Sequence, residues 1–68
     1  MINIRNYIIG NFKKDNKEDI KNAINDSINS KEEEPLIGLG VFFELLWNNS
    51  TNEEKDEIAE KIRNAVNI

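Results

Sequence analysis

The chain has 68 residues, no cysteine and no histidine, and its formal net charge is −4. This length allows one small domain near the lower limit for folding without a disulfide or metal. The missing cysteine excludes disulfides and thiolate metal sites, and the missing histidine removes the commonest general base and metal ligand. We therefore expect a single helical domain over residues 1–68, without cofactor or metal.

The charge is unevenly distributed, with +2 over residues 1–31 and −6 over residues 32–68. An acidic chain repels phosphate backbones, so the composition argues against a nucleic-acid partner. A short basic strip at Lys14, Lys17 and Lys21 is interleaved with carboxylates, and a solvated helix face accounts for it better.

No membrane or export signal is expected. The first twelve residues, MINIRNYIIGNF, lack the long apolar stretch and the cleavage site of a secretory signal. The apolar run over residues 35–47 is shorter than the roughly 20 residues that a membrane span needs. We expect an intracellular protein without membrane contact.

The first half of the chain predicts two helices. Asn3 is a candidate N-cap for a short helix, in which Ile4, Ile8 and Phe12 recur at every fourth position. Asp15 or Asn16 is the next candidate N-cap. A second, amphipathic helix follows over about residues 17–29, with one apolar stripe that consists of Ile20, Ile24 and Ile28.

The segment 35–47 (PLIGLGVFFELLW) is the most unusual part of the chain, because Glu44 is its only charge. On a helix, one face collects Leu36, Leu39, Phe43, Leu46 and Trp47. Most of the other side consists of Ile37, Val41, Phe42 and Leu45. A helix that is apolar on all sides is normally buried on all sides.

Where this third helix begins depends on two glycines. Proline is tolerated in the first turn of a helix, which favours a start at Pro35, but a start after Gly40 remains open. A glycine inside a helix costs about 1 kcal/mol relative to alanine. We expect Gly38 and Gly40 to be there because a neighbouring helix approaches the backbone closely.

A fourth helix is predicted to run to about Asn67. Its start is marked by a capping box, either Ser50 with Glu53 or Thr51 with Glu54. Its apolar stripe consists of Ile58, Ile62 and Val66.

These elements predict an all-α fold, a small bundle of three to four helices with a central apolar helix at about residues 35–48. We expect the apolar stripes of the other three helices to pack against this helix. Any part of it that stays uncovered would favour self-association, so a homodimer is an open expectation.

No catalytic set is visible in the sequence, and we expect a non-enzymatic protein. A buried Glu44 with a raised pKa would be a candidate acid or base, but no nucleophile or second titratable group accompanies it. A boundary position, in water or paired with a lysine of a neighbouring helix, explains this residue better. The consecutive carboxylates over residues 32–34 do not fit a calcium loop.

The third helix and its flanks resemble the small acid-soluble spore proteins of type I, which are minor proteins of the dormant endospore. The resemblance rests on the run LIGLGVFFELLW over residues 36–47 and on EKDE over residues 54–57, and it extends over nearly the whole chain. Two positions depart from the family pattern, with Ile37 where proline is usual and Lys31 where glycine is usual.

This resemblance implies a protein made during sporulation and found in the spore core. Together with the missing catalytic set, it leads us to expect a structural, packing or reserve role. The alternative is a helical adaptor that docks an unknown protein partner through Phe42, Phe43, Leu46 and Trp47. The family signature, and with it the candidate packing or interface surface, comprises Gly38, Leu39, Gly40, Val41, Phe42, Phe43, Glu44, Leu46 and Trp47.

Overall fold

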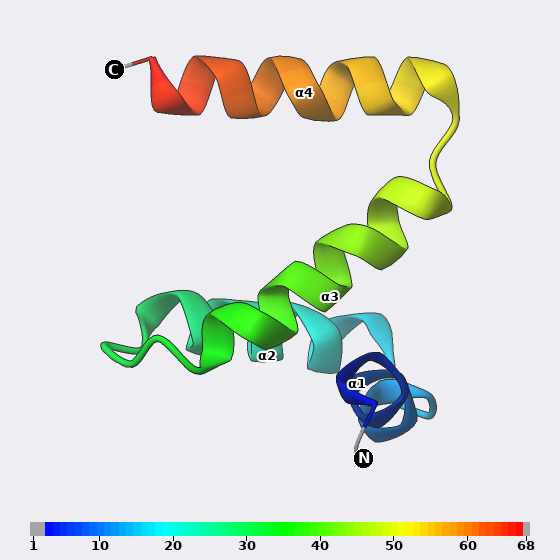
Figure 1. Cartoon of the computed structure of the whole chain (residues 1–68), viewed down its shortest axis with the longest axis vertical. Helices are drawn as coiled ribbons and strands as arrows, with labels where there is room; N and C mark the ends of the chain where they lie inside the picture. The colour runs from blue at the N-terminus through cyan, green and yellow to red at the C-terminus, as the bar shows by residue number, and fades with distance from the viewer. Residues whose placement is uncertain (1–2, 68) are drawn as a thin grey trace.

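A computed structural model describes residues 3–67, and this part of the chain is all-helical, without a strand (Figure 1). The four helices are α1 (Ile4–Phe12), α2 (Lys17–Asn29), α3 (Pro35–Asn48) and α4 (Asn52–Val66). The predicted fold class is therefore confirmed. Where the sequence specifies the end of a helix, the predicted limit agrees with the structure to within one residue.

Three of the helices start at side-chain caps that the sequence predicts. The Asn6 N–H donates to the side chain of Asn3 at 3.2 Å, which caps α1. Asn16 and Asp19 form a capping box at α2, and Thr51 and Glu54 form one at α4. Each box satisfies backbone N–H groups that the helix itself leaves without partners.

Helix α3 starts at Pro35, as the sequence favours, and the alternative start after Gly40 is wrong. Pro35 lies in the first turn, where its missing N–H leaves no hydrogen bond unmade. The N–H groups of Leu36 and Ile37 donate to the carbonyls of Glu33 and Glu34 at 3.0 and 3.1 Å. Ile37, where the family pattern has proline, thus uses an N–H that proline lacks.

Helices α1 and α2 both pack against α3, at the end of the molecule drawn in blue, cyan and green (Figure 1). Val41 of α3 is 8% exposed and is the one buried residue within residues 3–67. Beside it, the rings of Phe12 and Phe42 meet edge to face, with centroids 5.0 Å apart. This junction is the hydrophobic core, and it is small.

Helix α4 lies at the other end of α3, away from α1 and α2 (Figure 1). Only three residues, 49–51, separate it from α3. Its apolar stripe is covered in part, because Ile58 is half-buried while Ile62 is 46% exposed and Val66 is 74% exposed. Helices α1 and α2 contact α3, but Ile4 and Ile28 of their stripes are 49% and 63% exposed, so the three stripes cover α3 only in part.

Candidate functional site

One face of α3 remains open in the folded chain, and we call it the open face. It consists of the residues that the helical projection places together, namely Leu36, Leu39, Phe43, Leu46 and Trp47. Leu36 is 57% exposed, Phe43 is 42% exposed and Leu46 is 51% exposed. Large apolar side chains grouped in this way mark an interaction surface more often than a solvated one.

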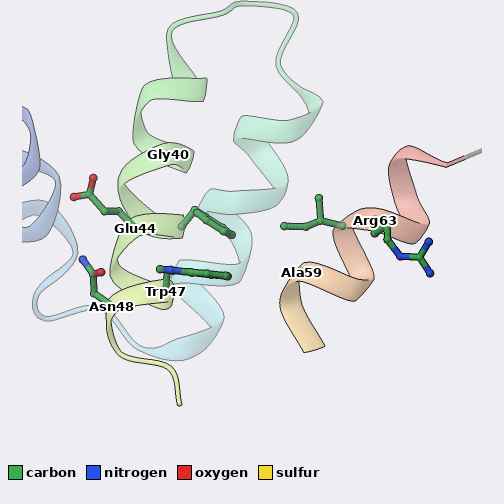
Figure 2. Close-up of a pocket in the computed structure, with 8 residues that line it drawn as sticks. Gly40, Glu44, Trp47, Asn48, Ala59 and Arg63 are labelled. Carbon is green, nitrogen blue, oxygen red and sulfur yellow. The ribbon is translucent and has the colours of Figure 1, made fainter. Parts of the chain in front are cut away.

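A cleft of about 550 Å³ lies between α3 and α4, at the C-terminal end of the open face. Trp47 points across it towards α4 (Figure 2), and Glu44 and Asn48 of α3 also line it. Ala59 and Ile62 form the facing wall on α4. The cleft thus has an aromatic wall and an aliphatic wall.

Trp47 is held in place by neighbours on both helices. Its ring stacks on Phe43, with centroids 5.7 Å apart and planes inclined by 27°. The Lys55 ammonium of α4 lies 5.6 Å from the Trp47 ring centroid, within the range of a cation–π interaction. Trp47 is therefore the main contact between α3 and the first turn of α4.

A second hollow, a groove of about 610 Å³, lies between α3 and the α1–α2 pair. Its apolar lining includes Phe12, Ile20 and Leu46, and Lys13 stands at its edge. Phe43 lines both the groove and the cleft, so the two hollows meet at this side chain. Together they extend the open face over all four helices.

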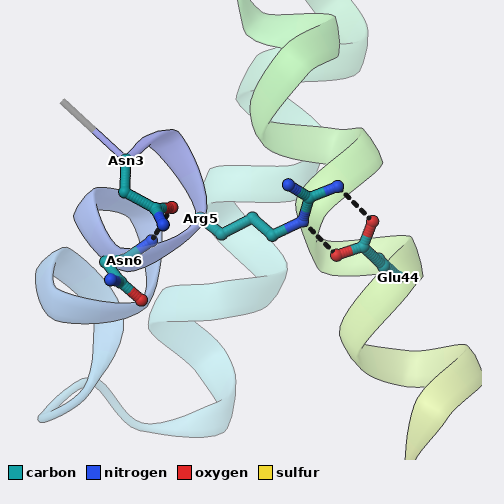
Figure 3. Close-up of polar contacts among 4 residues, drawn as sticks. All are labelled: Asn3, Arg5, Asn6 and Glu44. Atoms are coloured by element: carbon teal, nitrogen blue, oxygen red, sulfur yellow. Dashed lines mark hydrogen bonds and ion pairs between the residues drawn. The ribbon is translucent and has the colours of Figure 1, made fainter. Parts of the chain in front are cut away.

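Glu44, the single charge of α3, is paired with Arg5 of α1 (Figure 3). The guanidinium binds the carboxylate through two hydrogen bonds, Nε to Oε1 and Nη2 to Oε2, the latter at 3.0 Å. The hydrogen bond from Arg5 lowers the pKa of Glu44 and raises that of Arg5. Glu44 is thus ionised at neutral pH, the opposite of what a general acid requires.

The pairing agrees with the boundary position expected for Glu44, but the partner is an arginine rather than a lysine. The difference matters because a planar guanidinium binds both carboxylate oxygens at once, whereas an ammonium acts as a point charge. The pair links α1 to α3.

The two glycines of α3 do not serve the close helix contact that the sequence predicts. A Cβ at Gly38 would lie 3.7 Å from Ile8 Cδ1, which is ordinary van der Waals contact. A Cβ at Gly40 would meet nothing within 4 Å. The prediction is therefore wrong for Gly40 within this chain, and at Gly38 a neighbour is present without demanding glycine. Gly40 instead lines the cleft (Figure 2).

The family model for small, acid-soluble spore protein I matches residues 2–66. The chain belongs to this family. It is 37% identical over 65 residues to the small, acid-soluble spore protein I of Bacillus velezensis, which covers 96% of this chain and 92% of that protein. It is 40% identical over 60 residues to that of Halalkalibacterium halodurans, covering 88% of each, and 35% identical to that of Bacillus subtilis. No solved structure matches the chain.

In this small acid-soluble spore protein the signature residues divide between two sides of α3. Val41 and Phe42 belong to the core with α1 and α2, and Gly38 faces Ile8 of α1. The cleft or the groove is also lined by Leu39, Gly40, Phe43, Glu44, Leu46 and Trp47. Phe42, which the sequence assigns to a packing or interface surface, packs against Phe12 and also lines the groove.

Sequence reasoning missed two contributions to this site. Arg5 and Glu44 are 39 positions apart, and no local signal in the sequence connects them. Ile62 belongs to the apolar stripe that the sequence predicts for α4, and Ala59 lies beside that stripe. Their periodicity marks the correct face, but it does not show that the face borders a cleft.

Within residues 3–67 no three acidic residues lie close enough together to hold a metal ion. The same part of the chain contains no helix of the length and apolarity needed to span a bilayer.

Proposed function

We propose that this spore protein is a non-enzymatic structural or reserve component of the endospore core. The observation that carries the proposal is the family match over residues 2–66, which covers nearly the whole chain. The chemistry of the site supports it. The one carboxylate on the apolar helix is kept ionised by its pairing with Arg5.

Charge also supports a role that depends on abundance rather than on catalysis. The chain carries 13 acidic and 9 basic side chains, so full protonation of the acids changes its net charge from −4 to about +9. A strong net charge of either sign keeps a small protein soluble. Solubility at high concentration suits a packing or reserve protein.

The test is the amount of the protein in each stage and fraction. Immunoblots should find it absent from vegetative cells, present late in sporulation, and retained in spores stripped of their outer layers. A reserve role predicts that the chain disappears during germination, whereas a structural role predicts that it persists until outgrowth. Abundance in vegetative cells together with absence from spores would contradict the proposal.

A second candidate function, a helical adaptor for another protein, is favoured by the open face. Phe43 and Leu46 are 42% and 51% exposed, as expected of residues that a partner covers. A pull-down from sporulating cells should then recover one stoichiometric partner, and Leu46→Glu should lose it. Recovery of the bait alone would remove this candidate.

The protein used as bait in the pull-down also serves to test DNA binding. An acidic chain should not retard DNA even at low salt, where electrostatic binding is strongest.

A further inference from the structure

We propose that the open face and the α3–α4 cleft form the interface of a symmetric homodimer, in which a second copy of this chain covers them. This inference concerns the partner of the surface, and it holds or fails independently of the role in the spore.

The first argument is the amount of surface that a single copy leaves exposed. A compact monomer of 7.9 kDa exposes about 4,400 Å², whereas this chain exposes 6122 Å². The excess is about 1,700 Å². Permanent homodimers bury roughly 1,000–2,500 Å² on each subunit, so the excess is the area that such an interface needs.

The radius of gyration supports the same conclusion. It is 13.3 Å, compared with about 11 Å for a compact domain of 68 residues. The difference arises because α4 stands away from the α1–α2 pair (Figure 1). The cleft between α3 and α4 lies open beside it (Figure 2). The cleft is thus one place where contacts within the chain are missing.

The second argument is that the surface can bind a copy of itself. A two-fold interface brings the same patch from each subunit together, so a patch with unpaired like charges would repel its copy. Two of the charges that line the cleft already have partners within the chain. Glu44 is bound by Arg5, and Arg63 binds Glu60 at 2.8 Å. A second copy therefore meets apolar walls and two charges that are already paired, with the Lys55 ammonium over Trp47 as a further charge beside them.

The arrangement of α3 and α4 around the cleft allows the two copies to interlock. Exposed apolar side chains stand on both walls of the cleft, with Phe43 on α3 and Ile62 on α4. The α4 wall of each copy can enter the cleft of the other, which yields a bundle of two α3 and two α4 helices. Such pairing covers the α4 stripe and the open face in one step.

Gly40 provides the third argument. It lies inside α3, where glycine is unfavourable by about 1 kcal/mol, and nothing within its own chain requires it. Its position on the cleft leaves backbone accessible to a helix from outside. A second copy that crosses α3 at this point would explain why a side chain is absent.

The test is the molar mass from light scattering or sedimentation equilibrium over a range of concentrations. The native chain should approach twice 7.9 kDa as the concentration rises. Gly40→Leu adds a side chain only into open space within the monomer, yet it should weaken dimerisation at least about tenfold. The matched control is Gly10→Leu, which also enters open space but lies in α1, outside both hollows.

A second pair of variants keeps the test decisive if Gly40→Leu perturbs folding. Ile62→Lys places a charge on the cleft wall and should also weaken the dimer about tenfold or more. Ile28→Lys, at a residue of α2 that is 63% exposed and lines neither hollow, should leave it unchanged. Far-ultraviolet circular dichroism confirms that each variant remains helical.

Three results would overturn the proposal. One is a monomer at every concentration, whether α4 stays extended or folds back to reduce the radius of gyration to about 11 Å. Another is a dimer that Gly40→Leu and Ile62→Lys leave as tight as the native one. The third is a monomer that binds only a different protein through the open face, which would assign the surface to an adaptor.

Discussion

Helices α2 and α4 share the same sequence pattern but have different surroundings. Each begins with a capping box, has two acidic residues in its first turn and carries a stripe of apolar residues at every fourth position. Helix α2 lies against α3 and contributes Ile20 and Ile24 to an apolar groove. Helix α4 leaves Ile62 and Val66 largely exposed. Local signals therefore specify that a helix forms, but not what covers it.

The connections explain the difference in part. Residues 30–34 separate α2 from α3 and allow the chain to reverse, so that the two helices pack together. Residues 49–51 form a shorter link, and α4 leaves the end of α3 beside Trp47. The stability of α2 thus depends on packing as well as on its cap, whereas that of α4 depends mainly on local interactions.

The largest effect is expected from the core valine. Val41→Ala removes two methyl groups from the one residue that is buried within residues 3–67, which should lower the free energy of unfolding by about 2 kcal/mol. Val66→Ala, at a residue of α4 that is 74% exposed, should change it by less than about 0.5 kcal/mol. Urea denaturation followed by circular dichroism measures both. Equal effects would contradict the contrast between the two regions.

A smaller effect is expected from the helix caps. Thr51→Ala removes the hydroxyl that accepts from the Glu54 N–H at 3.1 Å, and Asn16→Ala removes the matching contact at Asp19. Each should cost about 1 kcal/mol. Carbon chemical shifts should show that α4 loses helicity after the first change, while α2 keeps its helicity after the second because α3 supports it. Equal fraying of both helices would show that packing does not distinguish them.

Gly38 provides a test of opposite sign. Gly38→Ala places a methyl group in ordinary contact with Ile8, so it should stabilise the protein by about 0.5–1 kcal/mol through the helix preference of alanine. Gly10→Ala, where the added Cβ meets nothing, should give a similar gain. Thermal unfolding measures both variants. A loss of stability confined to Gly38→Ala would show that α1 approaches α3 more closely than the structure has it.

The smallest effect is expected from the exposed Arg5–Glu44 pair, and it depends on pH. The pair lowers the pKa of Glu44 below its ordinary value of 4.5, so its stabilisation is complete above that pH and is lost as the pH falls through the lowered pKa. Arg5→Ala should therefore lower the melting temperature at pH 7 but not at pH 2. Arg63→Ala, which breaks a pair within α4, should leave the contact between α1 and α3 intact. If Arg5→Ala lowers the melting temperature by the same amount at both pH values, the result would contradict the pairing.

Most of the fold could be predicted from the sequence, because caps and periodicity are local. Asn3, Asn16 and Thr51 mark three helix starts, and Pro35 marks the fourth. The projection of α3 also separates Val41, which the structure buries, from Phe43, which it exposes. The family followed from the signature on the same helix.

The site could be predicted only in part, because its geometry depends on contacts between distant segments. The pairing of Arg5 with Glu44 requires that α1 lie on a particular side of α3, and no periodicity specifies that side. The empty space around Gly40 depends on the direction in which α4 leaves α3. A helical stripe such as that of α4 indicates that an apolar surface exists. The local sequence pattern does not indicate which surface covers it.

Amide hydrogen exchange, resolved by residue and measured at two protein concentrations, tests the central claim most directly. At high dilution, amides around Val41 should exchange slowly and those of α4 rapidly, and protection in α4 should rise as the concentration increases. Equal protection of Val41 and α4 at high dilution would show that α4 is covered within a single chain, which would contradict the account.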